Sequence, residues 1–129
     1  MLARIHWLVG VLGLVAFVVQ GQYLAYVVGP LADYPDGPRM LFRSSHIYLM
    51  FASVLNLALA GTHLPAAGWA RRLHQIGAAI VIAAPAVFIA GFIVEPTSGT
   101  LDRPISRLGL YLVFGVGVVW AVTAARLRR

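Results

Sequence analysis

The chain has 129 residues, of which 60% are hydrophobic and 11% are charged, and its formal net charge is +6. This balance lies outside the usual range of soluble domains and is typical of a membrane protein. Cysteine is absent, which excludes disulfides, thiolate metal sites and covalently attached c-type haem. The sequence has no phosphate-binding glycine loop, no His-Glu-x-x-His motif and no nucleophile with a base, so an enzyme acting alone is not expected.

Four charge-free apolar runs predict an all-α, integral membrane four-helix bundle. They cover residues 7–29, 44–61, 75–94 and 108–125, and each approaches the about 20 residues needed to cross about 30 Å of hydrocarbon. The connections are short, which favours an up-down-up-down arrangement within one domain, 1–129. The first run is too long for a cleaved signal peptide, so we interpret it as a retained helix. None of the runs carries an acid or an arginine at mid-membrane, so a pump or transporter is not expected.

The arginines indicate how the bundle is oriented. With the N-terminus inside, the inner segments carry six arginines and no acidic residue, whereas the outer loops carry four arginines and four acidic residues. The positive-inside rule therefore predicts that both termini are cytoplasmic. Arginine as the only basic residue besides histidine, with abundant Ala, Gly and Val, suggests a GC-rich bacterium and hence a bacterial inner membrane.

The basic residues also predict the class of partner. They border apolar helices instead of gathering on a soluble face, so nucleic-acid binding is not expected. At the cytoplasmic face they predict contact with anionic lipid headgroups.

A short motif that occurs twice in the sequence suggests two tandem helical hairpins. The tripeptides RIH at 4–6 and RLH at 72–74 each precede an apolar run, a proline and an acidic loop, followed by YLMF at 48–51 and YLVF at 111–114. A duplication would put the first and third helices at equivalent, diagonal positions, with His6 and His74 at the same depth. The alternative is convergence within a small apolar alphabet.

The histidines allow two interpretations. In the first, His6 and His74 are the axial ligands of a b-type haem, Arg4 and Arg72 pair with its propionates, and His46 is a further ligand shared across a dimer. In the second, which we favour, histidines near the helix ends lie at the membrane interface, solvated by headgroups. That second group consists of His6, His63 and His74.

Polar residues occur deeper in the second and first helices. Asn56 and Ser53 share one face of the second helix, which should point inward, and Gln20 lies nearer the outer side of the first. A buried amide needs a partner, so we expect these side chains to join helices. The alternative is a polar cavity for a lipid headgroup or a quinone. Pro85 is predicted to kink the third helix.

An outer-face polar cluster is predicted at the outer ends of the second and fourth helices. Its charges balance, which favours mutual salt bridges, with Asp102 as the N-cap of the fourth helix. The alternative is an anion site, because paired arginines offer fork-shaped donors. The cluster consists of Asp36, Arg39, Arg43, Asp102, Arg103 and Arg107.

Two function hypotheses follow from these patterns. The favoured one is an accessory or structural, lipid-interacting subunit that forms a homo-oligomer or associates with a partner membrane protein. The alternative is a b-type haem protein that carries electrons or senses redox state, with the haem iron as its one metal.

Overall fold

The computed structural model describes residues 1–26, 35–61 and 68–127. They form four α-helices, α1 (Leu2–Tyr26), α2 (Asp36–Ala60), α3 (Gly68–Val94) and α4 (Pro104–Leu127), and a short 3-10 helix, η2 (Glu95–Thr97). No strand occurs in these ranges. The predicted all-α four-helix bundle is therefore confirmed. The predicted end of the first span at residues 27–29, and His63, lie outside the described residues.

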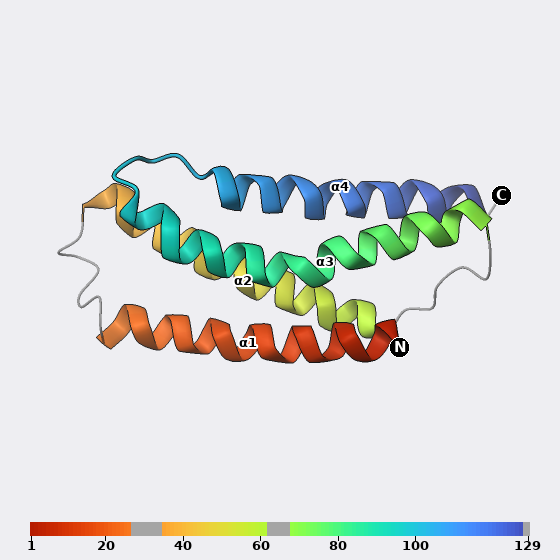
Figure 1. The fold of residues 1–129 in the computed structure, drawn as a ribbon, viewed down its shortest axis with the longest axis horizontal. Coiled ribbons are helices and arrows are strands. Elements are labelled where there is room, and N and C mark those ends of the chain that lie inside the picture. Colours follow the sequence, from red (N-terminus) through yellow and green to blue (C-terminus); the bar gives the residue numbers. More distant parts are fainter. Residues whose placement is uncertain (27–34, 62–67, 128–129) are drawn as a thin grey trace.

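The helices run up-down-up-down, and both ends of the chain lie at the same end of the bundle (Figure 1). α2 and α3 form a central pair, α1 packs mainly against α2, and α4 packs against α3. The repeated motif in the sequence predicted equivalent positions for the first and third helices. That prediction is wrong, because α1 lies on the flank of the bundle whereas α3 lies at its centre.

Three helical segments are long and apolar enough to cross a membrane: Leu2–Tyr26, Gly68–Thr97 and Pro104–Thr123. The flanking helices α1 and α4 expose large apolar side chains along their outer faces, among them Leu12, Val15 and Tyr111, as lipid-facing helices do. α2 has 25 residues, as α1 has, but it is less apolar and is not among the three. Its first residues are charged and its inward face is polar, so it depends most on its helical neighbours.

Glycines on α1 bring it close to α2. His6, Gly10, Gly13, Gln20 and Leu24 form the buried stripe of α1. A Cβ atom at Gly10 would lie 2.7 Å from Cγ of Leu57 and 3.0 Å from the backbone nitrogen of Leu57. Only glycine fits at this distance, so Gly10 sets how closely the two helices approach.

Pro85 lies inside α3 and is buried. Proline has no N–H, so Pro85 cannot donate to the carbonyl of Val81 four residues earlier, as a helical residue normally does. α3 is bent about halfway along its length (Figure 1). The predicted kink is therefore confirmed, and the carbonyl of Val81 needs another donor.

Candidate functional site

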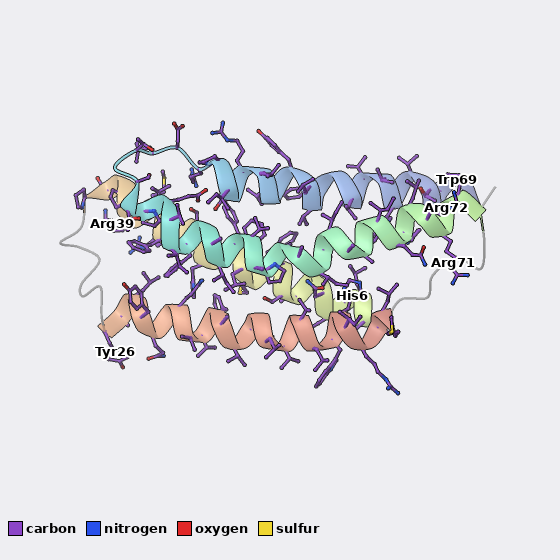
Figure 2. All side chains as sticks on the ribbon, viewed as in Figure 1. His6, Tyr26, Arg39, Trp69, Arg71 and Arg72 are labelled. Atoms are coloured by element: carbon purple, nitrogen blue, oxygen red, sulfur yellow. The ribbon has the colours of Figure 1, made fainter. Side chains whose placement is uncertain are left out.

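A buried polar cluster joins α1, α2 and α3. His6 is only 4% exposed and points from α1 toward the central pair (Figure 2). Its Nδ1 lies 2.7 Å from Oδ1 of Asn56, which is fully buried on α2. The Asn56 amide nitrogen donates to the carbonyls of Ala52, at 2.9 Å, and Val81, at 2.8 Å. Asn56 therefore supplies the donor that Pro85 withholds from Val81, and it ties three helices together.

The bonds of Asn56 also fix which atom donates in its hydrogen bond with His6. Both amide N–H groups of Asn56 are used by carbonyl oxygens, so its Oδ1 faces His6 and can only accept a hydrogen bond. Nδ1 of His6 must then carry a hydrogen and donate it to this oxygen. The prediction that His6 is solvated by headgroups at the interface is wrong, because the ring is buried and bonded to Asn56.

The other intramembrane polar residues differ from Asn56. Asn56 joins helices as predicted, but the Ser53 hydroxyl donates to the carbonyl of Leu49 in its own helix, at 2.6 Å. Ser53 lies against Gly13, and the small size of both residues lets α1 and α2 approach closely. Gln20 is buried on α1, and its Oε1 has no hydrogen-bond partner. The predicted helix-joining bond is therefore absent at that atom.

The three described histidines lie in different helix contacts. The His74 ring on α3 stacks on Trp120 of α4, with ring centroids 5.1 Å apart and an interplanar angle of 9°. The His46 ring on α2 stacks on Phe17 of α1 at 3.9 Å, and its Nδ1 is buried without a partner. His6 instead contacts Asn56. No described contact joins His6 to His74, so the structure does not assemble the predicted pair.

The small residues near the proposed haem ligands contact other helices. Leu57 fills the space beside Gly10, and Val116 and Trp120 would lie 2.8 and 2.9 Å from a Cβ atom at Gly77. These contacts do not favour the haem hypothesis, which an absorption spectrum of the purified protein would test directly. Within residues 1–26, 35–61 and 68–127, no cluster of three or more His, Asp or Glu side chains is placed to hold a metal ion.

The outer-face polar cluster is divided into local pairs. Asp36 and Arg39 form an ion pair within the first turn of α2. Arg107 lies 3.9 Å from Asp102, and Nη1 of Arg103 donates to the hydroxyl of Ser44 at 3.0 Å. The remaining member, Arg43, is exposed. The ion pairs are near neighbours in sequence, so most of this cluster positions its own loops, whereas the Arg103 bond links the residue directly before α4 to α2.

Sequence reasoning missed the role of Glu95, which is 1% exposed in η2. Its Oε1 accepts the backbone N–H of Ser106 at 2.8 Å, and its Oε2 accepts the Ser106 hydroxyl at 2.6 Å. The hydroxyl of Ser45 on α2 lies 3.4 Å from that of Ser106. The predicted N-cap Asp102 is therefore wrong, because Glu95 serves the first turn of α4 and links it to α2 and α3.

One signal for this role was present in the sequence. Glu95 directly follows an apolar run and precedes a proline, where a carboxylate can fold back to the next helix start. Gly91 leaves the room that this contact needs, because a Cβ atom there would lie 2.6 Å from the Ser106 hydroxyl.

The end of the bundle that holds both termini presents cationic and aromatic side chains. Trp69, Arg71 and Arg72 lie at this end, and Arg39 and Tyr26 lie at the other (Figure 2). An open hollow of about 550 Å³ is lined by Gly68, Trp69, Arg71, Arg72 and Gln75. Arginine guanidinium groups bind phosphate oxygens, and tryptophan favours the headgroup level of a bilayer. The hollow therefore has the chemistry of a site for an anionic headgroup.

Comparisons with protein families, with curated proteins and with solved structures give no match for this chain.

Proposed function

We propose that this protein is a multi-pass protein of a bacterial inner membrane that acts as an accessory, lipid-interacting subunit. The observation that supports this function most is the hollow lined by Trp69, Arg71, Arg72 and Gln75 at the start of α3. An anionic phospholipid would place its phosphate against the two guanidinium groups and its glycerol region beside the indole. Such a contact anchors α3 at the membrane surface.

The orientation forms part of the same proposal. Arg4, Arg71 and Arg72 lie near the ends of α1 and α3 that share one end of the bundle, and these segments carry no acidic residue. At the opposite end Asp36, Glu95 and Asp102 accompany the arginines. This asymmetry supports cytoplasmic termini by the positive-inside rule.

The flanking helices support association with other membrane helices. A Cβ atom at Gly115 or at Gly117 on α4 would meet nothing within 4 Å, so this part of α4 is open surface. Small residues on an exposed face let a second helix approach closely in a membrane. We propose that α4 contacts either a second copy of this chain or a partner membrane protein.

Native mass spectrometry of the protein released from detergent tests the lipid proposal. We expect phosphatidylglycerol to be retained by the wild type in preference to phosphatidylcholine. Replacing both arginines of the hollow, Arg71→Gln with Arg72→Gln, should lower this retention about tenfold, because two charge-assisted contacts are lost. The control replaces two exposed arginines of the opposite end, Arg43→Gln with Arg107→Gln. Equal retention in both double variants would contradict an anionic lipid site at the hollow.

A further inference from the structure

A second hollow lies at the other half of the bundle, where α1, α2 and α3 meet. It is an open groove of about 540 Å³ whose lining is mostly apolar. Three aromatic rings line it: Phe92 lies edge-on to Tyr23 at 6.2 Å and to Phe42 at 5.3 Å between ring centroids. Phe42 and Phe92 are buried, whereas Tyr23 is 43% exposed and presents its ring at the surface of the groove.

One buried amide borders this apolar groove. Gln20 lines the groove, is only 7% exposed, and its Oε1 is buried with no hydrogen-bond partner. A buried acceptor without a partner is destabilising, and a leucine at this position would fill a similar volume without that cost. This unpartnered amide oxygen therefore points to a ligand that brings a hydrogen-bond donor into the groove.

The depth of Gln20 limits which molecules can supply the donor. Gln20 is six residues from the end of α1 at Tyr26, which is about 9 Å along the helix axis at 1.5 Å per residue. At such a depth a phospholipid offers acyl chains, which form no hydrogen bonds, and ester carbonyls, which can only accept. The nearby hydroxyl of Thr97 is used, because it donates to the carbonyl of Val94 at 3.0 Å. A lipid-soluble molecule with a hydroxyl group can supply the donor at this depth.

We propose that this groove binds a membrane quinol. One ring hydroxyl donates to Oε1 of Gln20, the ring packs against Phe92 and its aromatic neighbours, and the isoprenoid tail leaves along Ile89 toward the lipid. The volume lies within the range of about 300–1,000 Å³ that is typical of small-molecule sites. The inference goes beyond the proposed lipid-interacting role and requires only that the bundle lies in a membrane.

Binding of a reduced benzoquinol with a decyl tail tests the proposal. The protein is placed in phosphatidylcholine nanodiscs, the quinol is radiolabelled and kept reduced with ascorbate, and retention is measured against empty nanodiscs. We expect saturable excess retention at one quinol per protein. Gln20→Leu should weaken it about tenfold, and Ile89→Trp should abolish it by filling the groove. The matched control is Gln22→Leu, an exposed glutamine two residues further along α1, which should bind as the wild type does.

Three outcomes would overturn the quinol site. The first is no excess retention by the wild type, and the second is equal binding by Gln20→Leu and Gln22→Leu when circular dichroism shows both folded. The third is a phospholipid held at one per protein by the wild type and lost in Ile89→Trp, which would assign the groove to lipid. The variants Arg71→Gln and Arg72→Gln should leave quinol binding unchanged, so failure of this site is distinguishable from failure of the headgroup site.

Discussion

The side-chain amide of Asn56 donates to the main-chain carbonyl of Val81, the oxygen that Pro85 leaves without its helical partner. A side chain of α2 thus replaces a backbone bond of α3. Inside a membrane this replacement matters, because no water is present to satisfy the free carbonyl. The same amide accepts from His6, so one residue satisfies polar groups of two neighbouring helices.

Removing Asn56 should destabilise the bundle. Asn56→Leu leaves the carbonyl of Val81 and Nδ1 of His6 unpaired in the interior, and we expect the free energy of unfolding to fall by about 1–3 kcal/mol. Unfolding by sodium dodecyl sulfate in mixed micelles, followed by circular dichroism, measures this change.

The Pro85→Ala background provides the control for this assignment. Alanine at position 85 restores an N–H for Val81, so Asn56→Leu should cost about 1 kcal/mol less there than in the wild type. An identical cost in the two backgrounds would show that Asn56 does not serve this carbonyl.

The close contact between α1 and α2 should not tolerate a methyl group at Gly10. Gly10→Ala forces Leu57 away, and overpacking of this kind costs about 1–3 kcal/mol. Gly21→Ala on the same helix is the matched control, because a Cβ atom there would lie 3.4 Å from Cε1 of His46, and its higher helix propensity should leave stability equal or raised by up to about 1 kcal/mol. The same unfolding assay compares the two variants, and an unchanged Gly10→Ala protein would argue against this packing.

Glu95, and not Asp102, should stabilise the start of α4. Glu95→Gln places an amide N–H₂ group against the donors of Ser106, and we expect a loss of about 1–3 kcal/mol. Asp102→Asn removes only an exposed charge 3.9 Å from Arg107, and its effect should stay below about 1 kcal/mol. Hydrogen exchange at the first turn of α4 provides the local readout. Equal protection in both variants would contradict the assigned cap.

The orientation can be tested with single cysteines, because the natural chain has none. Thr100→Cys lies in the connection before α4, and Trp69→Cys lies at the opposite end, at the start of α3. In intact spheroplasts a membrane-impermeant maleimide should label Thr100→Cys, and it should label Trp69→Cys only after permeabilisation. The reverse pattern would place the termini outside.

Apolar patterning predicts most of this fold, because a membrane helix must be apolar over its full span and satisfy its own backbone. The cores of all four helices follow from it, and the kink follows from the missing N–H of Pro85. Apolar patterning does not determine which helices pack against each other. α1 and α3 look alike in sequence, yet only α3 lies in the centre of the bundle, since Asn56 and the glycine contacts select the neighbours.

The candidate sites were predictable only in part. Asn56 was expected to join helices, because an amide within an apolar run has few other roles. His6 was predicted at the membrane interface but is buried against Asn56. Residue number along a helix indicates the depth of a side chain but not which neighbouring helix covers it. The contact of Glu95 with Ser106 depends on how the connecting segment folds back, and no periodic pattern describes that turn.

The order in which the cluster around Asn56 forms follows the direction of synthesis. His6 and Asn56 belong to the first hairpin and can pair as soon as α2 has entered the membrane. Val81 and Pro85 are synthesised later. When the bent helix α3 packs against the first hairpin, the Asn56 amide is already held in place by its hydrogen bond with His6. In a chain stalled on the ribosome after α2, Asn56 should therefore have its bond to His6 but lack the bond to Val81. A membrane chaperone would have most to protect when only this hairpin has been inserted.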